Sequence, residues 1–252
     1  MIITDPIFYL IAIPALTFLG LAKGGFAGLG SIATPLVALY LPPLEAAALI
    51  LPVLLFQDVI SVWIYRKDWS AWNLTVLLPG AAIGIGLAWA FAGFVSDDVI
   101  RITVGVIGVA FVANAFLNRR MTEPQQKTAA SGVFWGGVSG FVSMLTQGGS
   151  PPFHVHTLPQ RLPKMTLVGT TAIFFASVNV MKIAPYFALG QFNTRNLATS
   201  IVLLPLAVAT NFLGMWLVVR TPMEAFYKIT YVLALIISTA LIVQGVTNMM
   251  QA

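Results

Sequence analysis

The stretch GLAKGGFAGLGSIATP, from Gly20 to Pro35, is the part of the chain on which the fold depends. It continues an apolar segment, yet Lys23 is followed by a run of glycines that ends at Gly30 and Ser31. Glycine and proline weaken a helix, and a lysine is costly at membrane depth. A broken stretch is tolerated inside an apolar segment where its backbone lines a cavity. We therefore interpret it as an interrupted membrane helix.

A second stretch, TQGGSPPFHVH from Thr146 to His156, interrupts the other half of the chain in the same way. It also combines paired glycines with prolines directly after an apolar segment. Transporters often bind their substrate between two such interrupted helices, one from each half. We expect the two breaks to face each other and interpret them together as one anion-binding site.

The composition excludes an ordinary soluble domain. Of the 252 residues, 58% are hydrophobic and 8% are charged, whereas about a quarter of a typical soluble domain is charged. The sequence therefore predicts an all-α, polytopic helical membrane protein. The net charge of +5 is a property of the loops and does not indicate nucleic-acid binding. Cysteine is absent, which excludes disulfides and cysteine-ligated metals.

Apolar runs separated by charged or turn-forming residues predict the membrane segments. The first half has segments at residues 6–22, 46–65, 74–94 and 99–117, with a short arm at 31–41. The second half has segments at 131–145, 165–187, 197–219 and 225–246, with a short arm that ends at residue 158. We expect a first membrane repeat at 1–118, a polar central loop at 119–130 and a second membrane repeat at 131–252.

The two halves resemble each other in sequence. VIRITVGVIGVAFVANAFL, residues 99–117, matches FYKITYVLALIISTALI, residues 226–242, around a shared basic-Ile-Thr core. Asp58 falls near Asn179 in the same register. Internal duplication is typical of secondary transporters, which bind substrate between the repeats near the midplane of the bilayer.

The basic residues distinguish two topologies for these halves. If each broken segment returns to the side from which it entered, the halves are inverted, and the loop Lys and Arg residues divide nine to three between the two sides. If each broken segment crosses the membrane, the halves are parallel, and the division is seven to five. Because cytoplasmic loops carry an excess of Lys and Arg, we favour returning hairpins and inverted halves, with crossing segments as the alternative.

The chain resembles the sulfite exporter TauE/SafE family of bacterial membrane permeases. The resemblance rests on KGGFAGLGS in the first half, QGGSPP in the second, and two four-segment halves around a polar loop. It implies a multi-pass protein of the bacterial inner membrane that moves sulfite, a sulfonate, thiosulfate or a similar sulfur-containing anion. Ser150, Pro151 and Pro152 depart from the more usual glycine-rich second break, which leaves the substrate open within the family.

Interrupted helices suit an oxyanion for a physical reason. An oxyanion that enters a low-dielectric interior loses hydration and needs replacement donors. A helix that begins inside the protein offers unpaired N–H groups and a partial positive end, and glycine permits close approach. Lys23 adds a full charge, and Ser31 and Ser150 suit the caps of the returning arms. The predicted substrate-binding residues are Lys23, Gly24, Gly25, Gly28, Gly30, Ser31, Gln147, Gly148, Gly149, Ser150 and Asn179.

These residues also have simpler interpretations. Lys23 would then be a side chain that snorkels to the membrane interface, and the glycines would serve close helix packing. Asp58 lies inside a predicted span and is a candidate for proton coupling, with a structural ion pair to Lys23 or Lys182 as the alternative. For Lys182 itself, the simpler interpretation is that it marks a membrane interface.

His154 and His156 are the two histidines of the chain. Histidine titrates near neutral pH, so His154 is a second candidate for proton coupling, with simple hydrogen bonding as the alternative. We expect no metal site, because residues two positions apart do not share one face of a helix and no third ligand is evident.

The leading hypothesis is a secondary transporter that binds a small sulfur-containing anion and exposes it alternately to the two sides, with proton coupling as an option. A passive anion channel is the alternative, because it would use the same donors. An intramembrane enzyme is less favoured, because the sequence shows no convincing nucleophile–base pair or set of metal ligands. We expect the anion and the lipid bilayer as partners, no cofactor and no nucleic acid. A homodimer, the direction of transport and the coupling ion are left open.

Overall fold

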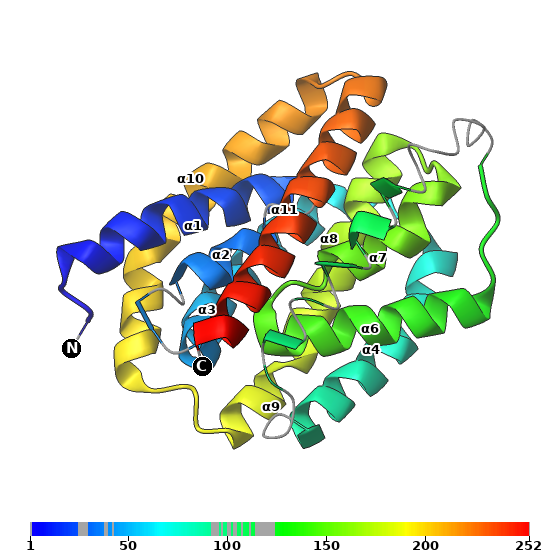
Figure 1. Ribbon diagram of the computed structural model, residues 1–252. Coiled ribbons are helices and arrows are strands. Elements are labelled where there is room, and N and C mark those ends of the chain that lie inside the picture. The colour runs from blue at the N-terminus through cyan, green and yellow to red at the C-terminus, as the bar shows by residue number, and fades with distance from the viewer. Residues whose placement is uncertain are drawn as a thin grey trace.

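The computed structural model describes residues 2–24, 30–37, 40–41, 43–91, 96, 98–99, 102, 105–106, 108–110, 112–113 and 124–251. These residues form helices and no strands (Figure 1). The first half contains α1 (Pro6–Gly24), α2 (Gly30–Val37), α3 (Pro43–Tyr65) and α4 (Ala71–Phe91), and the described residues from 98 to 113 are also helical. The second half contains α6 (Ala129–Thr146), α7 (Ser150–Thr157), the short 3-10 helix η1 (Leu158–Gln160), α8 (Lys164–Met181), α9 (Ile183–Ala188), α10 (Thr194–Arg220) and α11 (Met223–Gln251).

Several of these helices are long and apolar enough to cross a bilayer. Within the described residues, the candidate spans are 6–23, 45–65, 71–91, 129–146, 164–188 and 194–220. Large apolar side chains such as Leu10 and Phe187 are about three-quarters exposed, at 75% and 76%, as expected of helices that face lipid rather than water. The prediction of an all-α, polytopic membrane protein is confirmed.

Where the structure describes them, the predicted segments agree with the helices to within about five residues, with one informative difference. Much of the segment expected at 99–117, and residues 119–123 of the expected central loop, lie outside the described residues. The segment expected at 165–187 is divided at Lys182 into α8 and α9. Pro185 lies in the first turn of α9 and has no N–H to donate to the carbonyl of Met181. The helix is therefore interrupted close to Lys182.

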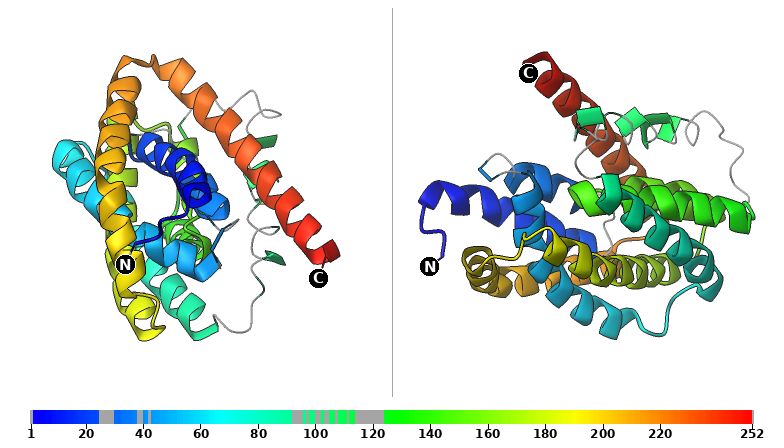
Figure 2. Two further views of the ribbon diagram at one scale, coloured as in Figure 1. Left: turned by 90° about the vertical axis from the view of Figure 1, so that its left-hand side faces the viewer. Right: turned by 90° about the horizontal axis from the view of Figure 1, so that it is seen from below.

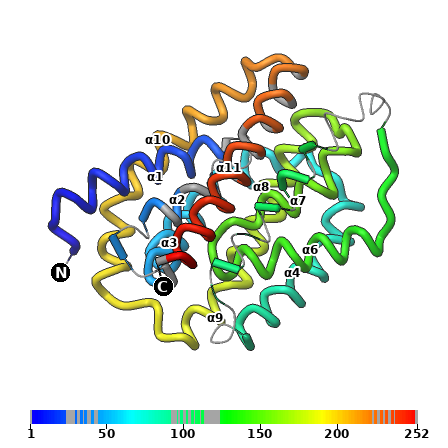
Figure 3. Tube along the Cα trace, viewed as in Figure 1, coloured from blue at the N-terminus to red at the C-terminus, as the bar shows by residue number. Residues whose placement is uncertain are grey.

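α1 and α2 form a hairpin, here called the first hairpin, that returns to the end at which it started (Figure 3). The Tyr40 hydroxyl, after α2, donates a hydrogen bond of 2.7 Å to Asp5 Oδ2, just before α1. The Tyr40 ring also lies 5.6 Å from the ring of Phe8. The hydrogen bond lowers the pKa of Asp5 and raises the pKa of Tyr40, because it stabilises the carboxylate and the protonated phenol.

α6 and α7 form the second hairpin, which closes in a similar way. The amide of Gln125, before α6, donates a hydrogen bond of 2.9 Å to the carbonyl of Pro159, after α7. Ser131 Oγ, in the first turn of α6, lies 3.2 Å from Nδ1 of His156, near the end of α7. The chain between residues 125 and 159 thus also leaves at the end where it entered.

The bases of the two hairpins lie at opposite ends of α3. The first hairpin closes at Tyr40, three residues before α3 begins at Pro43. The second hairpin closes near Gln160, which exchanges hydrogen bonds of 3.0 and 2.8 Å with Asn73, shortly after α3 ends at Tyr65. α3 has 23 residues, which corresponds to about 35 Å of helix. Such contacts favour returning hairpins over crossing segments.

Small residues allow α4 and α6 to pack backbone against backbone. A Cβ atom at Gly80 would lie 2.0 Å from the carbonyl oxygen of Val133, and one at Gly84 would lie 2.0 Å from that of Gly137. Later residues of α4 meet later residues of α6, so the two helices run in the same direction. Figure 1 shows them side by side.

α1 and α10 pack in a corresponding way in the other part of the molecule. The amide of Ile3, just before α1, donates a hydrogen bond of 3.0 Å to Thr199 Oγ1. The Thr210 hydroxyl donates a hydrogen bond of 3.3 Å to the carbonyl oxygen of Leu16. These two helices also run in the same direction. Each hairpin therefore packs its first helix against a helix of the other half.

α11 lies along one side of the bundle, beside the described helical residues between 98 and 113 (Figure 2). Asn248 Nδ2 donates a hydrogen bond of 2.9 Å to Asp98 Oδ1, and a Cβ atom at Gly105 would lie 2.5 Å from the carbonyl oxygen of Ser238.

The centre of the bundle is formed by α3 and α8, which run in opposite directions. Gly169 packs against the carbonyl of Asp68, and Asn179 contacts Asp58.

Candidate functional site

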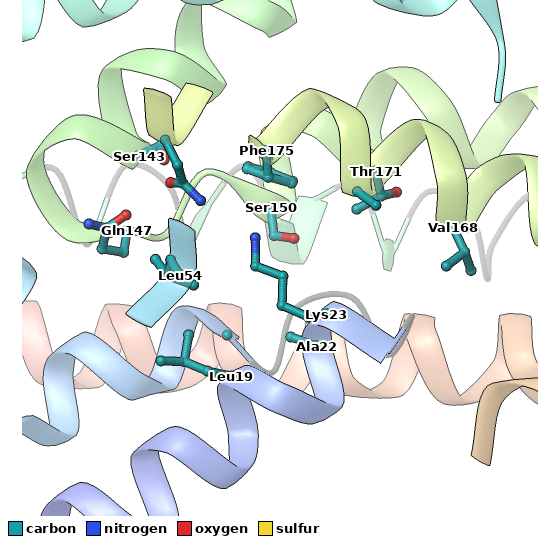
Figure 4. Close-up of a pocket in the computed structure, with 13 residues that line it drawn as sticks. Leu19, Ala22, Lys23, Leu54, Ser143, Gln147, Ser150, Val168, Thr171 and Phe175 are labelled. Carbon is teal, nitrogen blue, oxygen red and sulfur yellow. The ribbon is translucent and has the colours of Figure 1, made fainter. Parts of the chain in front are cut away.

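A pocket lies where the tips of the two hairpins approach α3 and α8 (Figure 4). Its volume is about 70 Å³, which is room for a few water molecules or one small oxyanion. The first hairpin, the second hairpin, α3 and α8 each contribute to its wall. The polar lining residues are Lys23, Ser143, Gln147, Ser150, Thr171 and Asn179, and the larger apolar ones are Leu19, Leu54, Val168 and Phe175.

Several predicted substrate-binding residues, drawn from both halves of the chain, line this pocket: Lys23, Gly30, Gln147, Ser150 and Asn179. Gly24 is the last residue of α1, and Ser31 is the second residue of α2. Gly25 and Gly28 lie outside the residues that the structure describes, as does the side chain of Ser31. The two breaks recognised in the sequence thus meet at one pocket.

Gly148 and Gly149 belong to the second break but are not part of the wall that the described residues form. A Cβ atom at Gly149 would lie 2.5 Å from the carbonyl oxygen of Ser139, and the Ser139 hydroxyl donates a hydrogen bond of 2.7 Å to Gly149 O. The amide of Gly148 donates to Thr146 Oγ1 at 3.2 Å. Gly149 therefore allows α7 to pack closely against α6, and a place for these two glycines in the substrate site stays a prediction.

Both return arms begin at the pocket. Gly30 is the first residue of α2, Ser150 is the first residue of α7, and both line the wall. The first amides of a helix have no acceptor within the helix, so a helix start attracts anions. Ser150 was expected as the cap of α7, but that position is occupied by Gly149.

The two helix starts differ in how many donors they offer. In α7, Pro151 and Pro152 follow Ser150, and proline has no N–H. Of these three residues, only Ser150 has a backbone N–H to offer an anion, together with its hydroxyl. The expectation that both breaks present several bare amides is therefore corrected for the second hairpin.

Lys23 and Asp58 form an ion pair at the pocket wall. Lys23 Nζ donates to Asp58 Oδ1, and Asn179 Nδ2 donates to Asp58 Oδ2 at 2.6 Å. The side chains of Lys23 and Asp58 are only 10% and 5% exposed. Figure 4 shows Lys23 extending from α1 across the pocket toward Ser150. The interpretation of Lys23 as a snorkelling residue is therefore wrong, and the ion pair that the sequence left as an alternative is present.

Lys182 is fully buried at the junction of α8 and α9. Its ammonium donates to Ser143 O at 3.3 Å, to Ser143 Oγ at 3.1 Å and to Gln147 Oε1. Because Ser143 and Gln147 both line the pocket, Lys182 lies directly behind its wall. The interpretation of Lys182 as an interface marker is wrong. Pro185 was a signal in the sequence for an interruption near Lys182, but no local signal showed that Lys182 would turn inward there.

His154 lies in α7, buried and apart from the pocket wall that the described residues form. Within the described part of the chain, its Nε2 atom has no hydrogen-bond partner. A role for His154 in proton coupling stays a prediction. His156 lies at the hairpin base and stacks on Trp72 with ring centroids 5.8 Å apart. Across the described residues, no group of three or more His, Asp or Glu side chains has the arrangement of a metal site.

Ser143, Thr171 and Phe175 are lining residues that sequence reasoning missed. They lie within helices that the sequence presents as ordinary membrane segments. Thr171 also uses its hydroxyl to donate to the carbonyl of Leu167 at 2.7 Å, a bond that any helical threonine can make. Which face of a buried helix meets the hairpin tips is set by packing between distant segments, so no local signal identifies these residues.

The family comparison bears directly on what this pocket serves. The family model described as Sulfite exporter TauE/SafE matches residues 12–241 of the chain. The chain belongs to the sulfite exporter TauE/SafE family. A TauE/SafE protein is a membrane transporter of the sulfite-exporter type, and the matched residues include both hairpins and every residue of the pocket wall. No curated protein and no solved structure matches the chain.

Proposed function

We propose that this protein is a secondary transporter of a small sulfur-containing anion, such as sulfite, thiosulfate or a sulfonate, in the bacterial inner membrane. The anion binds in the pocket between the two hairpin tips, where Lys23 supplies a positive charge. The starts of α2 and α7 supply hydrogen-bond donors, and Asn179 lies at the same wall.

The meeting of Lys23 with two helix starts from opposite halves is the observation that carries this proposal. A buried lysine is costly in a membrane protein and marks a functional site by default. A helix start adds a partial positive charge without adding an ion. Leu54 and Phe175 supply an apolar part of the wall, which suits the sulfur or short organic group of such an anion rather than a fully hydrated ion.

Asp58 supplies a route to proton coupling. It holds the Lys23 ammonium, so an anion that binds Lys23 competes with this carboxylate. A proton on Asp58 removes the competing charge and releases Lys23 to the anion. Proton and anion then favour each other's binding, and linkage requires this preference to be mutual. On this basis the two move in the same direction across the membrane.

The arrangement of the hairpins supports alternating access. Their bases lie at opposite ends of α3, and each first helix packs against a helix of the other half, α1 on α10 and α6 on α4. We interpret the halves as inverted repeats, which is the arrangement that lets one half rock against the other around a central site. The pocket between the tips is that central site.

A flux screen in proteoliposomes tests this function. Purified protein is reconstituted, and uptake of sulfite, thiosulfate, sulfate and small sulfonates is measured with and without an imposed proton gradient. We expect saturable uptake of at least one sulfur-containing anion, and exchange when the same anion is present inside. Fast ohmic current without saturation would instead identify a passive anion channel. Absence of flux for all of these anions would contradict the proposal.

A further inference from the structure

Lys182 is a buried lysine beside the site that the proposed function does not use. Its side chain is fully buried, at 0% exposure. Its partners are the carbonyl and hydroxyl of Ser143 and the amide oxygen of Gln147, and all of these are neutral. No described residue places a carboxylate in ion-pair contact with it, whereas Lys23 has Asp58. Within the described residues, a protonated Lys182 therefore has no counter-ion inside the membrane.

Neutral acceptors only partly compensate such a charge. Removing an ammonium from water is costly, and three dipoles do not replace a counter-ion. Lys182 does contribute to structure, because Ser143 O belongs to the last turn of α6, where carbonyls lack helical partners. Lys164 does the same for α10, donating to Val218 O at 2.8 Å and Thr221 O at 2.7 Å. Lys164, however, is only partly buried at the start of α8 and does not approach the pocket.

Gln147 stands between Lys182 and the pocket. Its Oε1 accepts from Lys182, its Nε2 donates to Ala47 O at 3.2 Å, and its side chain lines the wall. Its backbone is left-handed, with φ of 59° at the C-cap of α6, a position that favours glycine. Gln147 is therefore a residue of the pocket wall that contacts the Lys182 ammonium directly, from a backbone conformation unfavourable for a side chain.

We propose that Lys182 is a second anion-binding cation of this site and that Gln147 is its movable cover. This inference rests on the proposed function and names the charge of its preferred substrate. When Lys182 is protonated to hold the anion and Asp58 is ionised, two ammonium groups and one carboxylate leave one positive charge at the pocket. When Asp58 is protonated as well, two ammonium groups remain, and a doubly charged anion is matched. Lys182 thus favours a dianion over a monoanion.

The test compares a dianion with a monoanion on purified protein. Binding of thiosulfate and of methanesulfonate is measured by equilibrium dialysis for the wild type and for Lys182→Gln. We expect Lys182→Gln to lose at least about tenfold in thiosulfate affinity but less than about threefold in methanesulfonate affinity, because a doubly charged ligand depends more on the second cation. Lys164→Gln, which removes from the start of α8 a lysine that caps α10 away from the pocket, leaves both affinities unchanged.

A second variant keeps the test valid if Lys182→Gln does not fold. Gln147→Glu has nearly the same shape and places a carboxylate against Lys182, which cancels its charge. It is expected to reduce the preference for thiosulfate in the same way.

Equal losses for the two ligands, or no loss in either variant, would overturn the inference and leave the proposed function standing. A wild type that binds methanesulfonate but not thiosulfate would also overturn it. A wild type that binds and transports no sulfur-containing anion would instead remove the proposed function.

Discussion

The two hairpins share a backbone design but differ in charge. The first carries Lys23 at the end of α1, held by the carboxylate of Asp58 on α3. The second carries the neutral Gln147 at the end of α6, held by the ammonium of Lys182 at the end of α8. In both, the residue before a Gly-Gly pair at the tip is fixed by an ionisable residue from the helix that follows its hairpin.

The two hairpins thus share an outline and differ in the groups that they bring to the pocket. Two similar hairpins provide a pocket with a helix start on each side. The start of α2 retains its amides, whereas prolines leave the start of α7 with few. The carboxylate that we propose for proton coupling lies beside the first tip, and a lysine with no carboxylate partner among the described residues lies behind the second. We infer that the first hairpin couples transport to protons and that the second determines which anion is preferred.

The largest effect is expected from Lys23→Ala. It removes the Lys23 ammonium and leaves the Asp58 carboxylate without its partner. The pocket then loses a positive charge and keeps a negative charge that repels anions. Uptake of the preferred anion should fall by about 100-fold or more, in line with loss of a buried charge-assisted contact. Initial uptake rates in proteoliposomes measure this. Lys67→Ala, at an exposed position after α3, is the control and should transport normally.

Transport at the wild-type rate in Lys23→Ala would erase the contrast between the two tips. The first hairpin would then have no greater part in binding than the second.

Asp58→Asn should separate binding from coupling. The amide mimics the protonated carboxylate, so the variant should still bind and exchange the anion. It should lose the response to a proton gradient, with accumulation lower by about tenfold, because no group at the first tip gains a proton. Uptake at several external pH values, with and without an imposed gradient, gives the answer. A variant with the pH dependence of the wild type would place the coupling elsewhere, with His154 the next candidate.

A smaller effect is expected when a methyl group is added to a glycine in each of the two hairpins. A Cβ atom at Gly149 would lie 2.5 Å from Ser139 O, whereas one at Gly30 would lie 3.3 Å from the side chain of Ala22. Gly149→Ala should therefore destabilise the protein by about 1–3 kcal/mol through overpacking, and Gly30→Ala should change stability by less than about 1 kcal/mol. Thermal unfolding in detergent measures the stability of the two variants. The reverse order would mean that the first hairpin is the more tightly packed.

The smallest effect concerns the base of the first hairpin. The Tyr40 hydroxyl donates to Asp5, and this bond raises the pKa of Tyr40 because ionised phenol could not donate it. In Asp5→Asn, Tyr40 should therefore ionise at a lower pH than in the wild type. Both proteins are titrated to alkaline pH while the absorbance of the phenolate band is recorded. The difference between the two titrations measures the change in the pKa of Tyr40. Identical titrations would show that the hairpin base is open in solution.

Most of the fold followed from local patterns in the sequence. Apolar runs predicted the helices, and Gly-Gly pairs with nearby prolines predicted both breaks, because these signals act on the residues that carry them. The same signals placed Lys23, Gly30, Gln147 and Ser150 at one site before any contact was known.

Packing between distant segments determines what local patterns cannot predict. Gly149 was predicted to line the site, and its missing side chain also allows contact with Ser139. The simpler interpretation of Lys182 placed it at an interface, but the interruption near Pro185 and the approach of α6 bury it. A helical pattern states that a residue lies in a helix, and it does not state which distant helix that face will meet.

The central claim is that a small oxyanion binds between the two hairpin tips beside Lys23. Anomalous diffraction from crystals grown with selenite, a pyramidal oxyanion with a strongly scattering centre, locates the ligand directly. The account predicts a selenium peak in the pocket, within contact of the Lys23 ammonium and the start of α2. A peak at another position, in protein that binds selenite in solution, would contradict it.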